Sequence, residues 1–117
     1  MTDLNPALKI DHDIDPAAFQ AAAGQAARLL RALGNERRLM ILCRLGGEEL
    51  PVSALVEASG LSQSALSQHL ALLRDEGLVA TRREGQSIFY RIHDPAVLQV
   101  IATLAAIFCP PELLKGS

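Results

Sequence analysis

Aromatic residues are scarce in this chain of 117 residues: they make up 3% of it, and tryptophan is absent. Proteins that hold single-stranded nucleic acid, sugars or methylated lysine on stacked rings need several aromatic side chains. The composition therefore argues against these three kinds of binding.

Cysteine is also rare, with only Cys43 and Cys109. Two cysteines do not make the disulfide framework of a small secreted protein. The sequence shows no N-terminal segment in which basic residues precede an apolar run of about 7 to 15 residues, and no run of about 18 uncharged apolar residues. We therefore expect a cytoplasmic protein without a membrane span, in which both thiols are free and any bond between them is transient.

Charge is divided unevenly along the chain. Overall, 11 basic residues stand against 13 acidic ones, for a net charge of −2. Residues 1–16 hold four of the acidic residues, only one lysine and no apolar period, which predicts a flexible acidic arm. From residue 17 onward, ten basic residues stand against nine acidic ones. The net charge of the whole chain therefore does not exclude binding to nucleic acid.

The patterning predicts a mainly α domain with a β-hairpin wing over residues 17–109, followed by a tail over 110–117. Half of the residues are hydrophobic, and the length suits one domain with one core. Capping residues and helix breakers delimit helices over 17–33, 35–45, 52–58, 62–77 and 94–109. Residues 78–83 and 87–92 flank Gly85 as two strands of a hairpin. This order, with a short turn at Gly60, is that of a winged helix-turn-helix.

The helix predicted over 62–77 has a polar face suited to DNA. Leu66, Leu70 and Leu73 recur at helical spacing and belong to the core. The opposite face carries four short polar side chains, Gln63, Ser64, Ser67 and Gln68. Such groups hydrogen-bond to base edges and phosphates in a major groove, whereas serine lowers helix propensity unless it has another use. We predict that this face, with Ser62 as N-cap, binds DNA; a merely soluble helix face is the alternative.

Three further residues are candidates for DNA contact. Arg82 and Arg83 lie at the hairpin edge, where a pair of guanidinium groups suits phosphates or a narrow minor groove, although a basic pair in a surface turn is often only solvated. His69 lies between the apolar and polar faces of the helix predicted over 62–77. A packed, hydrogen-bonded histidine is therefore as compatible with its position as a phosphate contact.

No group of residues indicates catalysis. Ser67 and His69 are only two positions apart on a helix and cannot face one another, so we expect neither an enzyme nor a cofactor. The Asp11-His12-Asp13 group has metal-ligand chemistry, but in a flexible acidic arm we do not expect it to hold a metal. An architectural DNA-binding protein without an inducer, and a protein-interaction module that uses the helix over 62–77, stay open as alternatives.

Several stretches resemble the ArsR/SmtB family of dimeric winged-helix repressors. They are Leu33-Gly34-Asn35-Glu36-Arg37-Arg38-Leu39, Gly60-Leu61-Ser62-Gln63-Ser64, Ser67-Gln68-His69-Leu70 and Leu73-Arg74-Asp75-Glu76-Gly77-Leu78-Val79. The resemblance covers about residues 27–109 and implies a homodimer, built from the first and last helices, that binds a palindromic operator in double-stranded DNA. Many members sense metals, but residues 52–58 lack their cysteine pair, and the last helix has no histidine and no acidic residue after Asp94. We therefore expect no metal site.

The two cysteines resemble those of the persulfide-responsive subgroup of this family, of the SqrR, BigR and YgaV type. In that subgroup the reduced dimer binds its operator, and reactive sulfur species link one cysteine in the second helix to one at the end of the last. The resemblance therefore implies Cys43 and Cys109 as the switch, reactive sulfur species as the inducer, and genes of the sulfide and persulfide response as targets.

The residues alone leave the chemistry of this pair open. A direct disulfide needs Cα atoms within about 7 Å, and each inserted sulfur adds roughly 2 Å of reach, so a wider pair favours a polysulfide bridge. The alternatives are a peroxide-type sensor that closes a plain disulfide, and a winged-helix repressor with another inducer in which both cysteines are small buried hydrophobes.

Overall fold

The computed structural model describes residues 15–109. Most of the predicted acidic arm, including Asp11-His12-Asp13, and the predicted tail over 110–117 lie outside these residues. The chain divides into two compact units between Arg31 and Ala32. No helix in the described part is long and apolar enough to cross a lipid bilayer.

The described part of the first unit belongs to helix α1 (Pro16–Leu33). Asp15 caps this helix as predicted, because the backbone N–H of Ala18 donates to its carboxylate over 3.0 Å. Proline at the first helical position has no N–H to satisfy and is preset for the helix. The start of α1 thus follows from two residues that are adjacent in sequence.

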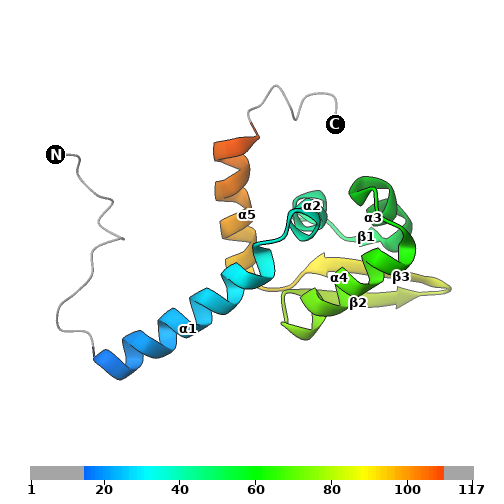
Figure 1. Ribbon diagram of the computed structural model, residues 1–117. Helices are drawn as coiled ribbons and strands as arrows, with labels where there is room; N and C mark the ends of the chain where they lie inside the picture. The colour runs from blue at the N-terminus through cyan, green and yellow to red at the C-terminus, as the bar shows by residue number, and fades with distance from the viewer. Residues whose placement is uncertain (1–14, 110–117) are drawn as a thin grey trace. The chain divides into compact units, whose positions relative to one another are not determined.

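The second unit contains a three-stranded antiparallel sheet and the remaining helices (Figure 1). Its elements are α2 (Glu36–Leu45), β1 (Leu50–Pro51), α3 (Val52–Ser59), α4 (Gln63–Asp75), β2 (Val79–Glu84), β3 (Ser87–Ile92) and α5 (Pro95–Phe108). Strand β3 lies in the middle, between β1 and β2. The predicted helices and hairpin are therefore confirmed, within about two residues at each end, and the mainly α fold with a β-hairpin is the observed one.

Strand β1 is the element that the sequence did not predict. Leu50 pairs with Tyr90, and Pro51 pairs with Phe89. Two residues are too few to show an alternating pattern, and proline lacks the N–H that a central strand needs. The strand forms at the edge of the sheet because β3 offers it a partner, which is a property of the folded chain and not of the local sequence.

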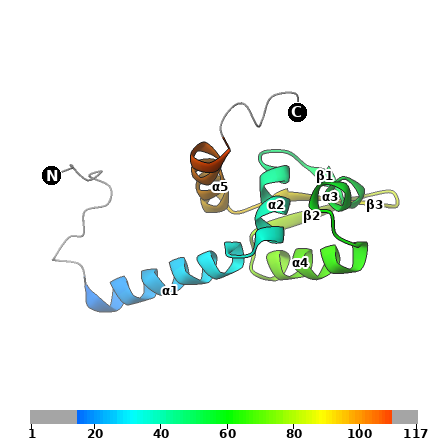
Figure 2. The same cartoon turned by 45° about the horizontal axis from the view of Figure 1, so that its top comes forward.

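The core is built from leucine, isoleucine and valine side chains on four helices. The fully buried ones are Ile41 and Leu42 and Leu45 of α2, Leu55 of α3, Leu66 and Leu70 and Leu73 of α4, and Val97 of α5. Burying each such side chain contributes about 1.5–3 kcal/mol, so the three leucines of α4, predicted as core, hold that helix firmly. The turn between β2 and β3 projects beyond α3 and α4 (Figures 1 and 2).

Candidate DNA-binding surface and cysteine pair

The polar face predicted on α4 is exposed. Gln63, Ser64, Ser67 and Gln68 are all exposed to solvent. The leucines on the opposite face are buried at 0–1% exposure, so α4 cannot rotate to hide its polar side chains. The helix therefore presents to solvent a row of side chains that donate and accept hydrogen bonds.

Ser62 serves the helix itself. Its Oγ accepts a hydrogen bond from the backbone N–H of Ala65 over 3.2 Å, which caps the N-terminus of α4 as predicted. The hydroxyl hydrogen is not used in that bond, because the oxygen is the acceptor. Ser62 is exposed, so the same group that starts the helix still has a donor for a ligand.

The turn between α3 and α4 is fixed by hydrogen bonds around Ser59. This side chain is fully buried; its Oγ donates to the carbonyl of Val56 over 3.3 Å and accepts from the N–H of Leu61 over 3.2 Å. Gly60 has φ of 70°, a left-handed conformation that other residues adopt at a cost of about 1–2 kcal/mol. Arg37 of α2 donates to the Ser59 carbonyl over 3.0 Å. The angle between α3 and α4 is thus set partly by α2.

His69 is half-buried at the boundary between the two faces of α4. Its Nδ1 lies 3.5 Å from Nη1 of Arg38, which projects from α2. The predicted position is observed, and the partner on α2 is one that sequence reasoning missed. A local signal existed: Arg37 and Arg38 lie in the first turn of α2, after Glu36, where a cation is unfavourable beside the positive end of the helix dipole. Their position suggests acceptors outside the helix.

The two wing arginines do not act as a pair, because successive residues of a strand point to opposite faces of the sheet. Arg82 is paired with Phe89, and Arg83 is paired with Ile88. Arg83 therefore shares a face with Ile88 and with the buried Tyr90, the face covered by the helices. The two guanidinium groups, which were expected to lie side by side, therefore lie on opposite faces of the sheet.

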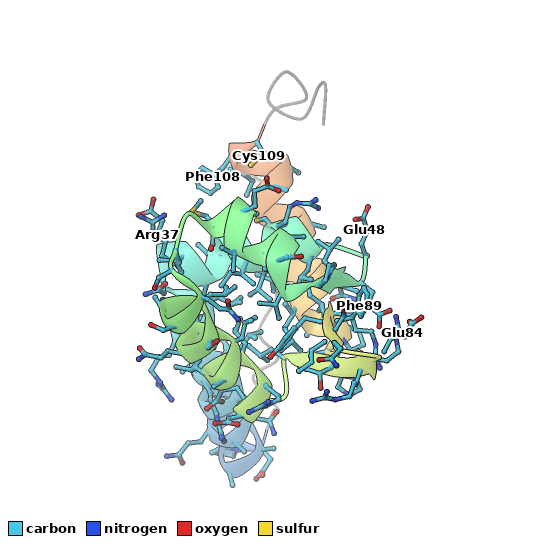
Figure 3. All side chains as sticks on the ribbon, turned by 90° about the vertical axis from the view of Figure 1, so that its right-hand side faces the viewer. Arg37, Glu48, Glu84, Phe89, Phe108 and Cys109 are labelled. Atoms are coloured by element: carbon cyan, nitrogen blue, oxygen red, sulfur yellow. The ribbon has the colours of Figure 1, made fainter. Side chains whose placement is uncertain are left out.

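Arg82 is held by three neighbours. Its Nε and Nη2 donate to one carboxylate oxygen of Glu49 over 3.0 and 2.8 Å, and its Nη1 donates to Glu84 over 2.6 Å. Its guanidinium carbon lies 4.8 Å from the ring centroid of Phe89. Phe89 and Glu84 lie together on the hairpin in Figure 3. The hydrogen bond to Glu49, and after it the one to Glu84, raise the pKa of Arg82, and the bond from Arg82 lowers the pKa of Glu49. The charge of this arginine is therefore largely compensated within the protein.

Arg83 is exposed and makes no ion pair or side-chain hydrogen bond with the residues that the structure describes. Its guanidinium has five N–H donors and a permanent positive charge, which suit a phosphate group. Glu49, in contrast, was not predicted, because it precedes Arg82 by 33 positions and no local pattern connects them.

The two cysteines lie on elements that contact each other. Cys43 is exposed on α2, and Cys109 is half-buried directly after α5, beside Phe108 (Figure 3). Helices α2 and α5 pack together. Although Cys43 is exposed, neighbouring atoms shield its thiol from part of the solvent; this partial desolvation, and second the charge of Cys109, raise its pKa. The two sulfurs are therefore within electrostatic reach of one another, and both are free thiols.

The described residues contain no group of three or more His, Cys, Asp or Glu side chains that could hold a metal ion. The helix–turn–helix, the exposed polar face of α4 and the projecting hairpin together define a winged helix-turn-helix DNA-binding protein.

The family follows from the comparison with known proteins. Residues 35–81 match the family described as bacterial regulatory protein, arsR family. The chain is 48% identical to the HTH-type transcriptional regulator YgaV of Escherichia coli (strain K12) over 95 residues, which cover 80% of this chain and 96% of that protein. This chain therefore belongs to the ArsR family of bacterial transcriptional regulators, as its sequence motifs indicated.

Solved structures agree with this assignment. Reduced HlyU from Vibrio cholerae N16961 is 47% identical with a TM-score of 0.76, over 79% of this chain and 97% of that one. The transcriptional repressor BigR from Xylella fastidiosa is 36% identical with a TM-score of 0.74, over 82% of this chain and 98% of that one. The winged-helix fold and the family resemblance predicted from the sequence are thus confirmed.

Proposed function

We propose that this ArsR-family regulator is a homodimeric repressor that releases its operator when reactive sulfur species link Cys43 to Cys109. One observation carries the proposal: two thiols far apart in sequence lie on α2 and directly after α5, two helices that pack together. The raised pKa of Cys43, to which Cys109 contributes, agrees with this placement. Two cysteines that served only as small apolar side chains would not need to lie on elements that pack together. The similarity to BigR, which is named a repressor, supports repression as the outcome of binding.

The operator-binding surface consists of the exposed face of α4 with the wing residue Arg83. Polar side chains on α4 suit base edges and phosphates in the major groove, and the wing reaches the neighbouring sugar–phosphate backbone of the DNA. A dimer presents two copies of α4, so the matching operator is a palindrome with half-sites about one helical turn of DNA apart.

The dimer is supported by the composition and exposure of α5. None of its 14 residues is charged, yet only Val97 and Ile101 are buried within the chain. Ile107 and Phe108 are 63% and 70% exposed. A helix that is apolar on all sides is normally covered on all sides, and a second copy of α5 offers a matching apolar surface. Phe19 and Leu30 give α1 a similar exposed apolar character.

The bridging chemistry uses the sulfane sulfur of a persulfide as the oxidant. One cysteine thiolate attacks the outer sulfur of RSSH, so that a protein persulfide forms and RS⁻ leaves. A second RSSH extends the chain by one sulfur in the same way. The other cysteine thiolate then attacks the middle sulfur of the protein-bound chain and expels HS⁻, which leaves a trisulfide bridge. Both cysteines are oxidised, and the released hydrosulfide carries the two electrons.

The bridge fixes α2 to α5, and this link explains the release of DNA. If α5 forms the dimer contact, a change in its packing against α2 alters the separation of the two α4 helices. A palindromic operator tolerates little change in that separation, because its half-sites are set by the pitch of the duplex.

The test measures operator affinity in three states: reduced, treated with glutathione persulfide, and treated with peroxide. Intact mass is recorded for each state. We expect loss of affinity with persulfide, together with a mass gain in multiples of sulfur that maps to Cys43 and Cys109. If affinity is unchanged when both thiols are modified, the proposal is wrong. If peroxide alone releases DNA, through a disulfide with a loss of two hydrogens, the protein is a peroxide-type sensor instead.

A further inference from the structure

Arg38, in the first turn of α2, connects three helices. Its backbone N–H is held by the N-cap Asn35, whose side chain accepts over 3.0 Å. Its Nε donates to the carbonyl of Ala32, in the last turn of α1, over 2.6 Å. Its Nη1 lies 3.5 Å from Nδ1 of His69 on α4. One guanidinium thus joins the end of α1, the start of α2 and the middle of α4.

The electrostatics of the helix ends explain why this side chain extends away from its own helix. A cation is unfavourable beside the positive N-terminus of α2 and favourable beside the unpaired carbonyls at the C-terminus of α1. Arg38 reaches such a carbonyl at Ala32. The neighbouring Arg37 does the same at the C-terminus of α3, where it donates to Ser59. Both arginines therefore bind groups outside α2, and both contribute to positioning the helix-turn-helix.

The chemistry of the contact determines the state of His69. A guanidinium group can only donate hydrogen bonds, so Nδ1 of His69 has to be the acceptor. A neutral imidazole that accepts at Nδ1 carries its proton on Nε2. Arg38 therefore favours the tautomer of His69 in which the N–H donor is on Nε2, the ring nitrogen that does not face Arg38.

We propose that Arg38 is a positioning residue for operator binding: it holds His69 of α4 so that Nε2–H donates to a DNA phosphate, and it ties α4 to the helix that carries Cys43. The inference rests on the proposed function, because it assumes that α4 binds the operator. It assigns His69 to the DNA surface and explains how a change at the thiol pair reaches that surface through one rigid helix. Phosphate contacts of this kind orient a protein on the duplex without reading a base.

The test is a double-mutant cycle on the reduced full-length protein, with Arg38→Gln, His69→Ala and the double variant. Fluorescence anisotropy gives the affinity for the operator and for a random duplex, and circular dichroism checks folding. We expect each single variant to lose about tenfold in operator affinity, and the double variant to lose about tenfold as well, because the two residues act through one contact. Affinity for the random duplex should fall by a similar factor, because a phosphate contact carries no sequence information.

Arg44→Gln is the matched control. It removes the same charge from the same helix, but at the last turn of α2, where Arg44 forms an ion pair with Glu48 at 3.9 Å. We expect less than a threefold change in operator affinity from this variant. A loss of about a hundredfold in the double variant would mean that Arg38 and His69 act independently, and a loss in Arg38→Gln with none in His69→Ala would mean that Arg38 supplies only charge. Either result overturns the positioning role.

Two conservative variants of His69 test the same inference without changing Arg38. The amide nitrogen of His69→Gln reaches the position of Nε2, whereas His69→Asn reaches only that of Nδ1. We expect His69→Gln to keep operator affinity within about threefold and His69→Asn to lose about tenfold, as for one lost hydrogen bond to a charged group. The reverse order contradicts a contact through Nε2.

The persulfide response separates this inference from the proposed function. The ratio of reduced to bridged operator affinity should be at least about threefold smaller in Arg38→Gln than in the wild type, because the link from α2 to α4 is cut. A non-additive cycle with no persulfide response in the wild type supports the positioning role and contradicts the sulfur switch. An additive cycle with a normal response in the wild type contradicts the positioning role alone.

Discussion

The guanidinium of Arg82 donates two hydrogen bonds to a single carboxylate oxygen of Glu49, over 3.0 Å from Nε and 2.8 Å from Nη2. Glu49 lies directly before β1, so the pair joins the edge of the sheet to the outer face of the wing. Glu84 accepts a hydrogen bond from Nη1 of the same guanidinium. The wing therefore has one arginine that is bound within the protein and one, Arg83, that is exposed and makes no ion pair with the described residues.

This division predicts different salt dependences for the two wing arginines. Arg83→Ala should reduce the slope of log affinity against log salt concentration by about one per protomer, as for one lost phosphate contact. Arg82→Ala should reduce it by clearly less, because its charge is already compensated. Operator titrations at several salt concentrations measure both slopes, and equal reductions would contradict the assignment. Glu49→Gln removes one of the two carboxylate partners of Arg82 and should make the slope steeper.

Ser62 allows helix capping to be separated from DNA binding. Ser62→Ala removes the oxygen that accepts from Ala65 and should lower the free energy of unfolding by about 1 kcal/mol. Ser62→Asp keeps a capping oxygen and should retain stability, but its negative charge beside DNA phosphates should weaken operator binding about tenfold or more. Urea denaturation and anisotropy measure the two effects. If the aspartate variant binds DNA like the wild type, Ser62 lies outside the interface.

The cysteine variants test the switch against a structural role. Cys43→Ser and Cys109→Ser should each bind the operator within about threefold of the wild type, because neither side chain is part of the fully buried core. Neither should respond to persulfide, since each lacks one end of the bridge. Loss of operator binding in both reduced variants would show that the cysteines are structural. Because α2 and α5 of one chain pack together, the wild-type bridge should leave a monomer on a non-reducing denaturing gel.

The raised pKa of Cys43 predicts the pH dependence of its reactivity. Only the thiolate is alkylated, so a raised pKa slows the reaction at neutral pH. It also shifts the midpoint of the rate–pH curve above the value for a free cysteine, about 8.5. Cys109→Ser removes the second cause of the shift and should lower the midpoint. Burial, the larger cause, stays, so the midpoint should still exceed the ordinary value. Peptide mapping after timed iodoacetamide treatment across pH measures this, and a wild-type midpoint below the ordinary value would contradict it.

The helices of this protein were predictable because their signals are local. Asn35, Ser62 and Asp94 each stand directly before a helix and bond its first N–H groups, so a few adjacent residues determine each start. The leucines of α4 recur at three and four positions, and the observed burial follows that period. The short strand β1 carries no such signal, because its pairing depends on β3, some 40 residues later.

The candidate site was predictable only in part, for the same reason. The polar face of α4 follows from helical periodicity, but the separation of Arg82 from Arg83 became evident only with strand register. The arginines of α2 showed a local sign of unusual roles, in that they stand at the positive end of a helix, while their partners Ser59 and His69 lie 22 and 31 positions away.

The sequence by itself determined the order of the helices and the hairpin, the helix caps, the polar face that α4 exposes and the family to which the chain belongs. These features depend on periodicity and on contacts between residues a few positions apart, so the local sequence is enough to determine them. Only the tertiary structure decided which charges are compensated and which groups meet: Arg82 with Glu49, and Arg38 with His69. It also decided that α2, which carries Cys43, packs against α5, which ends at Cys109. Such pairs depend on how distant elements pack, and packing is set by the whole core.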